Sequence, residues 1–279
     1  MGPPDQGLTV GATIIDHGID AGLAWHYGDP LREQRWLEDG TGVVDLANRQ
    51  VVRITGADRR DLIGQDESPN STGSTYWLSP QGQIIAHLAW VECADAIWGW
   101  SEPGHGLSDQ LNHLDPGLDI TIEAHPDMTV IFSGQPGQIA RSGTPDCLGG
   151  YELFLPRETP LTGRPVGIWA LTARRIAAGV PRLGVDTDQS TVMAELLPYG
   201  TPRRLVRLHL DGCAERFLDP GTPLVLADEP TTTVGFVGSM SYHYQLGPIA
   251  LGLVDSAINN SATLVADGVP ATIEQITRA

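Results

Sequence analysis

The alternation of apolar and polar positions in the first two-thirds of the chain predicts short strands with a few helices among them. Positions 50–55 alternate with period two, as in a half-buried strand, and positions 30–38 have a helical spacing. A helix is also predicted at 165–178, with Pro165 near its start and one apolar face. Other predicted strands are 12–15, 42–46, 75–78, 83–92, 96–100, 118–123, 129–133 and 151–155, and other predicted helices lie at 56–63 and around 107–114.

After residue 201 the helical period disappears, and short strands alternate with glycine-rich turns, which is typical of a small β-barrel. The predicted strands are 205–210, 223–226, 232–239, 249–254, 262–265 and 271–276. The predicted fold class is therefore α+β: antiparallel sheets with packed helices, followed by a C-terminal β-barrel. The expected domains are a weakly structured N-terminus (1–25), an α+β region (26–200, with intertwined subdomains near 26–127 and 128–200) and the barrel (201–279).

The charge of the chain is strongly negative, with a net charge of −17, and all 17 basic residues are arginine. Such a surface repels phosphate backbones and anionic lipids, so we expect no direct nucleic-acid or membrane partner. Arg203, Arg204 and Arg207 form either a local anion site or a solvated strand edge beside acidic neighbours. No run of eighteen apolar residues is present, and the start lacks the pattern of a signal peptide, so the expected compartment is the cytoplasm.

The three cysteines, Cys93, Cys147 and Cys213, are far apart and form no Cys-x-x-Cys pair or Cys/His cluster. Neither a metal site nor a disulfide framework is supported, and we expect structural thiols.

Four blocks of sequence, together covering most of the chain, resemble the YgfZ/GcvT family of tetrahydrofolate-binding proteins. They are residues 24–34 with 42–46, residues 52–59, the Leu-Ser-Pro-Gln-Gly-Gln-Ile hairpin at 78–84, and residues 234–239 with 246–254. The helix stop in 175–187, with Gly179 and Pro181, also resembles the middle of the family. The shared order of these blocks argues against a chance similarity.

The resemblance implies a three-part ring of domains around a central channel that holds a reduced folate. GcvT proteins transfer an aminomethyl carbon to tetrahydrofolate in glycine cleavage, and YgfZ proteins assist iron–sulfur enzymes, including a tRNA-modifying one. The YgfZ loop Lys-Gly-Cys-Tyr-x-Gly-Gln-Glu, which carries the functional cysteine, is missing between Asp188 and Gly200. Either the chain has lost the loop, or the sequence omits a mobile segment.

The hairpin at residues 81–85 decides between the two branches, because the transferase branch places an acidic pair directly after it. Ala86 and His87 occupy those two places here. Alanine has no acid–base chemistry, and successive strand residues face opposite sides, so His87 does not replace the first acid. This argues against aminomethyl transfer, and His87 is interpreted as a structural or solvent-facing histidine.

Candidate folate contacts follow from the resemblance and from what a pterin needs, namely an aromatic slot and arginine for its glutamate tail. They are Trp169, Arg175, Tyr76 and Trp77. The alternative is a core role for Trp169 and a surface salt bridge for Arg175. One of Tyr76 and Trp77 faces inward, where it meets either the ligand or the core. Tyr242, His243 and Tyr244 form either a contact patch or a plain turn. No catalytic and no metal-binding residue is predicted.

The function hypothesis is a YgfZ-like tetrahydrofolate-binding protein of one-carbon metabolism that assists iron–sulfur protein assembly or repair. If the chain has truly lost the cysteine loop, it would act without turnover. The expected partners are iron–sulfur proteins or their assembly factors. One alternative is an aminomethyltransferase like the glycine cleavage T-protein. The other is a scaffold that no longer binds folate.

Overall fold

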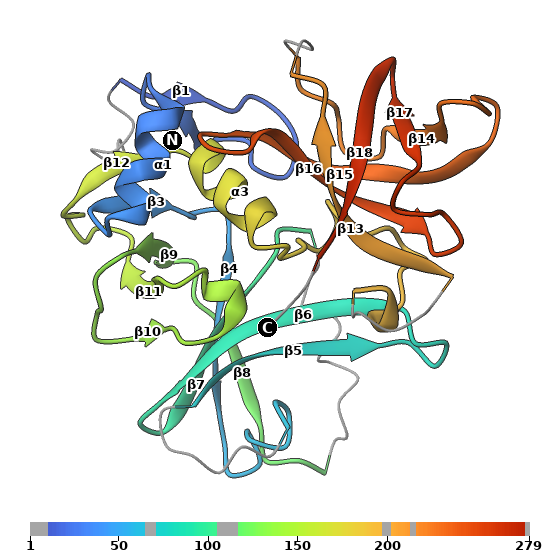
Figure 1. The fold of residues 1–279 in the computed structure, drawn as a ribbon. Helices are drawn as coiled ribbons and strands as arrows, with labels where there is room; N and C mark the ends of the chain where they lie inside the picture. The colour runs from blue at the N-terminus through green and yellow to red at the C-terminus, as the bar shows by residue number, and fades with distance from the viewer. Residues whose placement is uncertain (1–10, 65–70, 105–116, 197–201, 213–215, 277–279) are drawn as a thin grey trace. The chain divides into compact units, whose positions relative to one another are not determined.

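The structure, a computed structural model, describes residues 11–64, 71–104, 117–196, 202–212 and 216–276 (Figure 1). Contacts divide the chain into two compact units. Unit 1 comprises Met1–Trp77 and Ile85–Ile168, and unit 2 comprises Leu78–Ile84 and Trp169–Ala279. The hairpin tip at residues 78–84 therefore belongs with the second half of the chain. No helix within the described ranges is long and apolar enough to cross a membrane.

Unit 1 contains two five-stranded sheets, in which each strand pairs antiparallel except for one parallel pair, β12 with β3. The first sheet has the order β10 (Ala140–Arg141), β11 (Tyr151–Pro156), β9 (Met128–Ser133), β3 (Gly42–Asp45), β12 (Arg164–Val166). The second has the order β5 (Thr72–Leu78), β6 (Ile84–Cys93), β7 (Ala96–Ser101), β4 (Gln50–Thr55), β8 (Thr121–Ala124). A small pair, β1 (Thr13–Ile14) with β2 (Ala24–His26), precedes them.

Helix α1 (Pro30–Glu38) has the bounds that the sequence predicts, because both of its ends are specified locally. The Asp29 side chain accepts a hydrogen bond from the Arg32 amide at the N-terminus, and Pro30 occupies the first turn. Leu37 is buried, and so is Glu33, whose carboxylate accepts hydrogen bonds from the amides of Tyr27 (2.7 Å) and Gly167 (2.8 Å). These contacts fix α1 onto unit 1 along one face.

Helix α3 (Ile168–Ala177) begins three residues later than the sequence predicts. Residues Arg164–Val166 instead form β12, which pairs with β3. Proline lacks an amide hydrogen, and β12 is an edge strand, where Pro165 leaves no ladder bond unmade. The end of the helix agrees with the sequence: Gly179 has a φ of +69°, and a side chain there would meet Ile276 at 2.5 Å.

The predicted helix at 56–63 is wrong, since residues 57–63 form successive turns. Gly56 has a φ of +110°, and its backbone lies so close to Asp119 that a Cβ atom would sit 2.0 Å from the Asp119 carbonyl oxygen. The Asp58 carboxylate accepts a hydrogen bond from the Asp119 amide (2.8 Å). This long-range pairing holds the segment in turns. The helix expected around 107–114 lies outside the described residues.

Unit 2 is a closed barrel with α3 packed against it, which confirms the predicted C-terminal barrel. Around the barrel the strands are β13 (Arg203–Leu210), β16 (Gly247–Asp255), β15 (Thr233–His243), β14 (Pro223–Leu226), β17 (Thr263–Ala266) and β18 (Val269–Gln275). Its interior is apolar, and Ile176 of α3 packs in a second cluster with Leu205, Ile249 and Leu251. The described chain is mostly sheet and has two α-helices, so the set of helices packed on the sheets that the predicted fold class requires is not shown.

Candidate functional site

Ala86 and His87 are neighbours on strand β6 and point to opposite faces of its sheet. They stand where the transferase branch would carry its two acids. Ala86 is 0% exposed and lies in an apolar cluster with Ile54, Leu62 and Leu88. His87 points to the other face of the sheet, as the sequence predicts. The position of the first acid therefore lies in hydrophobic core, where a carboxylate would lose its hydration without gaining a partner.

His87 is buried rather than solvent-facing, with 9% of its surface exposed. Its ring lies 4.5 Å from the Tyr76 ring and 6.0 Å from the Trp100 ring, between centroids. Within the described ranges its Nε2 atom has no hydrogen-bond partner. Burial lowers the pKa of His87 to about 4, because the charged imidazolium would lose its hydration. At neutral pH the ring is uncharged.

A buried ionic cluster lies beside His87, centred on Arg141, which is 0% exposed. Arg141 donates to the Glu152 carboxylate (2.8 Å), pairs with Asp146, and also donates to Ser74 Oγ (2.8 Å). Burial by itself would raise the pKa of Asp146, but Arg141 and the Ser74 hydroxyl outweigh it and lower that pKa to about 2. Burial raises the pKa of Glu152, and Arg141 opposes this shift. The cluster satisfies its own charges and joins strands β5, β10 and β11.

The Cys147 thiol belongs to this cluster. Its Sγ atom lies 3.2 Å from Arg141 Nη1 and 3.1 Å from Thr144 Oγ1. Burial, followed by the charge of Glu152, raises the pKa of Cys147 to about 11. The thiol is therefore protonated at neutral pH and is not an activated nucleophile. No group of three or more potential metal ligands occurs among the described residues.

The candidate folate contacts Tyr76 and Trp77 lie on opposite faces of β5. Tyr76 stacks on His87 on the side of the ionic cluster. Trp77 packs against the apolar cluster that contains Ala86. Both side chains are half-buried. The two residues therefore face different environments within unit 1.

The candidate contact Trp169 lies in unit 2 within an aromatic cluster. Its ring meets Phe217 edge to face at 4.8 Å between centroids and lies 6.1 Å from Tyr242. The indole Nε1 donates to the Tyr242 carbonyl oxygen (3.3 Å). Trp169 and Tyr242 are half-buried, and Phe217 is exposed. Tyr242 and His243 end strand β15, and only Tyr244 lies in the turn that follows, so Tyr242 belongs to a cluster with Trp169. The sequence analysis did not predict Phe217.

Arg175, on the same helix, is held by unit 2 itself. Its guanidinium donates to Asp186 (2.7 Å) and to the Val180 carbonyl (2.7 Å), and it also bonds Ser239. Asp186 is 0% exposed at its side chain and accepts from the Ser239 amide (2.6 Å). The pair therefore ties the turn after α3 to strand β15.

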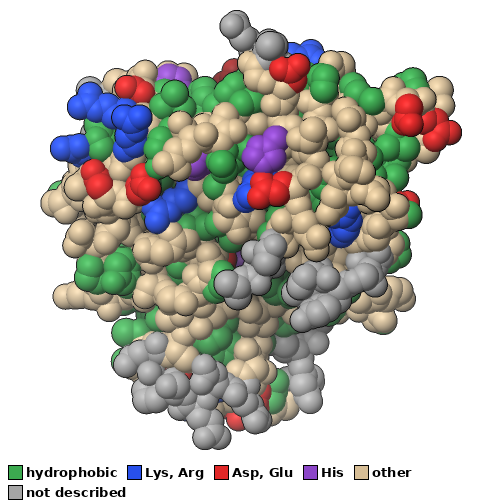
Figure 2. All heavy atoms as spheres, in the orientation of Figure 1, with side chains coloured by type: hydrophobic (Ala, Val, Ile, Leu, Met, Phe, Trp, Pro, Cys, Tyr) green, Lys and Arg blue, Asp and Glu red, His purple; other side chains and the backbone are tan. Residues whose placement is uncertain are grey.

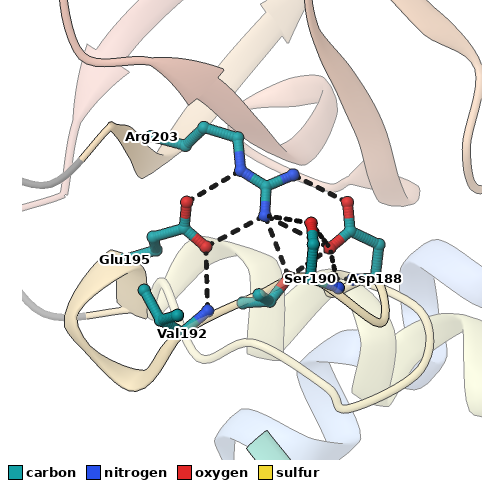
Figure 3. Close-up of polar contacts among 6 residues, drawn as sticks. Asp188, Ser190, Val192, Glu195 and Arg203 are labelled. Atoms are coloured by element: carbon teal, nitrogen blue, oxygen red, sulfur yellow. Dashed lines mark hydrogen bonds and ion pairs between the residues drawn. The ribbon is translucent and has the colours of Figure 1, made fainter. Parts of the chain in front are cut away.

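Arg203 clamps the segment that precedes the barrel (Figure 3). Its guanidinium forms a two-pronged contact with Glu195 (2.8 and 3.0 Å) and donates to Asp188 at 2.7 Å. Glu195 also accepts from the Val192 amide (3.0 Å). Hydrogen bonds from Arg203 lower the pKa of Asp188, aided by the hydroxyls of Ser190 and Thr191.

The clamped segment also holds the tip of the hairpin at 78–84. Gln83 pairs with Val192 as an isolated bridge, and the Ile84 amide donates to the Thr191 carbonyl at 3.0 Å. All three arginines of the predicted patch are engaged within the chain. Arg207 bonds Glu274 and the Ala177 carbonyl, and Arg204 bonds the Ile258 carbonyl and Asn260. The patch lies on β13, which pairs on both sides in the closed barrel, so it is a set of partnered arginines and not a strand edge.

Known proteins resemble this chain in structure, but none of the family models or curated proteins matches its sequence. Among solved structures, the chain is similar to the glycine cleavage system aminomethyltransferase T from Bartonella henselae, with a TM-score of 0.73 and 16% identity. The match covers 95% of this chain and 94% of that chain. The chain has the GcvT-like fold.

The GcvT-like fold agrees with the resemblance seen in the sequence, and at this identity it establishes the fold alone. It does not separate the YgfZ branch from the transferase branch. The assignment to either branch stays a prediction from the sequence.

Proposed function

We propose that this protein binds a reduced folate and assists the assembly or repair of iron–sulfur proteins, as a YgfZ-like protein that catalyses no turnover. The observation that carries the proposal is the combination of a GcvT-like fold over 95% of the chain with Ala86 in apolar core. The fold supports a folate site. The missing carboxylate argues against aminomethyl transfer, because no group at that position can move a proton.

Trp169 is the best-supported folate contact. It belongs to an aromatic cluster in which Phe217 keeps 37% of its surface exposed, so flat apolar surface is available for a pterin ring. Arg175 would share its guanidinium between Asp186 and a glutamate-tail carboxylate. Tyr76 and Trp77 stay predictions from the sequence, and because they lie on opposite faces of β5, one folate would contact only one of the two rings. A reduced folate is the expected ligand. The cytoplasm is the proposed compartment.

Calorimetric titration with folinic acid tests the binding part of the proposal. We expect saturable binding by the wild type, at least tenfold weaker binding by Trp169→Leu, and unchanged binding by the control Trp36→Leu, whose ring lies in unit 1 on α1. Equal binding by Trp169→Leu would remove Trp169 from the site. Absence of binding by the wild type would favour a scaffold that no longer binds folate.

A second assay separates the proposal from the transferase alternative. The purified protein is supplied with tetrahydrofolate and with the other glycine cleavage components carrying an aminomethyl group. We expect no methylenetetrahydrofolate above background, because Ala86 cannot act as the acid or base. Turnover in this assay would establish the transferase in its place.

A further inference from the structure

Arginines in this acidic protein are mostly held by carboxylates of their own chain. Ion pairs of this kind occupy Arg49, Arg53, Arg59, Arg60, Arg141, Arg175, Arg203, Arg207 and Arg216. Arg32 and Arg164 differ: each has its guanidinium carbon 5.2 Å from the centre of the Trp36 ring. Both side chains are exposed, and within the described ranges neither makes an ion pair. Figure 2 shows basic side chains gathered over α1 and β12.

Three carboxylates on or beside α1 accept hydrogen bonds from other groups. Asp29 accepts from the Arg32 amide at the helix N-terminus (3.0 Å), and Glu33 is buried under α1. Asp39 accepts from both the amide and the hydroxyl of Thr41 (2.9 and 2.6 Å). Hydrogen bonds from Thr41, and also the charge of Arg164, lower the pKa of Asp39, so Arg164 has an acidic neighbour. Within the described ranges, however, neither guanidinium is closed in an ion pair, and both stay open to a further carboxylate.

The surface around the two arginines is apolar as well as basic. The Leu31 side chain is 45% exposed, and the Trp36 side chain is half-buried. Leu37 and Glu33 anchor the opposite face of α1, so the exposed face is rigid. Arginine and tryptophan are the residue types that most often dominate binding at protein interfaces, and a rigid platform lowers the entropy lost on binding.

We propose that Leu31, Arg32, Trp36 and Arg164, here called the arginine–tryptophan face, bind an acidic peptide segment of a partner protein. Carboxylates of that segment pair with Arg32 and Arg164, and an apolar side chain between them contacts Leu31 and the indole. At physiological salt, charges more than about 8 Å apart are largely screened from each other. A short segment bound at this face therefore interacts with Arg32 and Arg164 more than with the net negative charge of the rest of the chain. A nucleic acid extends beyond the face onto a chain of net charge −17 and is repelled. This proposal does not depend on folate binding.

The test uses the whole protein and a fluorescein-labelled synthetic peptide of repeated Asp-Phe-Glu-Leu sequence, with binding read as fluorescence anisotropy. We expect saturable binding that weakens about five- to tenfold in each of Arg32→Gln and Arg164→Gln. The matched control is Arg216→Gln, which makes the same change in charge at an exposed arginine of the barrel. It should bind as the wild type does. Raising salt from about 0.05 M to about 0.5 M should weaken the wild-type complex.

Several results would overturn the proposal. The first is the absence of saturable binding by the wild type, and the second is an Arg32→Gln/Arg164→Gln double variant that binds the peptide as tightly as the wild type does. The third is equally good binding of a peptide with Asn and Gln in place of its acids. Equally tight binding of a single-stranded oligonucleotide of the same charge would assign the face to nucleic acid. Self-association that the double variant abolishes would assign it to a second copy of the chain.

Discussion

Replacing Arg203 with alanine should destabilise unit 2, and the two carboxylates that Arg203 binds should contribute unequally. The Glu195 side chain is 4% exposed, so without Arg203 it becomes a buried charge with one remaining donor, the Val192 amide. Leaving one partner of a buried ion pair alone costs about 3–5 kcal/mol. The Asp188 side chain is 41% exposed, and an exposed pair contributes about 0–1 kcal/mol. Since Arg203 itself is 22% exposed, water offsets part of the loss, and we expect about 3 kcal/mol in total.

Urea unfolding followed by circular dichroism and by tryptophan fluorescence measures this loss, provided that the two probes give coincident transitions. Asp188→Asn should cost no more than about 1 kcal/mol. The matched control is Arg204→Ala, the next residue on β13, whose guanidinium donates to the uncharged Ile258 carbonyl and Asn260 side chain. It should cost about 1 kcal/mol.

A double-mutant cycle between Arg203→Ala and Glu195→Ala isolates the pair, with an expected coupling of about 2 kcal/mol. Hydrogen exchange gives a local readout, because the Ile84 amide donates to the clamped segment and should exchange faster in Arg203→Ala. Coupling below about 0.5 kcal/mol, or equal costs for Arg203→Ala and Arg204→Ala, would refute the argument from burial.

The clamp should also depend on pH. Hydrogen bonds from Arg203 lower the pKa of Asp188 in the folded protein. The ionised carboxylate therefore stabilises the fold at pH values above the pKa of about 3.9 that Asp188 has in the unfolded chain. That contribution is lost as pH falls below about 4. The stability difference between wild type and Asp188→Asn should therefore be constant near neutral pH and shrink in acid.

Three further predictions concern unit 1. Ala86→Asp should lower the free energy of unfolding in urea by about 3–5 kcal/mol, because it places a carboxyl group in apolar core. The control Ile85→Asp, at a position 39% exposed on the same strand, should lower it by about 0.5 kcal/mol. Similar losses for the two variants would place Ala86 outside the core. His87 has its pKa lowered from 6.5 to about 4, so protons favour the unfolded state, and the fold should lose up to about 3 kcal/mol as pH falls from 6.5 to 4. His87→Gln should lack that component, and an unchanged pH slope would contradict it. In a Cys93→Ser/Cys213→Ser background, iodoacetamide at pH 8 should label Cys147 at least about 100-fold more slowly in the native protein than in urea. The reason is that the thiol is buried and has a pKa of about 11. Rapid labelling of the native protein would contradict the burial of this thiol.

Local signals in the sequence were sufficient for most of the elements. Asp29 and Pro30 start α1, Gly179 ends α3, and period-two alternation gives β4. The close spacing of short strands and glycine-rich turns predicts the barrel. The segment at 56–63 failed because its conformation depends on Asp119, far along the chain, which no local pattern reveals. The late start of α3 has the same origin, since β12 forms only by pairing with β3.

The ionic cluster around Arg141 was not predicted, because its members come from separate strands that only the fold brings together. One signal was present in the sequence: Glu152 shares the buried phase of strand β11 with Phe154, where an unpaired acid would be costly. The Arg203 clamp offered a weaker signal, two acids flanking the hydroxyl residues Ser190 and Thr191. Trp169 was predicted as a candidate, but its neighbours Phe217 and Tyr242 were not predicted as a cluster with it.

Binding of folinic acid to the wild-type protein tests the central claim most directly. Seven tryptophans report on the ligand, and Trp169 is the one in unit 2. The account predicts saturable quenching of tryptophan fluorescence, matched by a calorimetric isotherm of the same affinity and much reduced in Trp169→Leu. No quenching and no heat of binding in the wild type would contradict it, and the GcvT-like fold would then serve this protein without a folate.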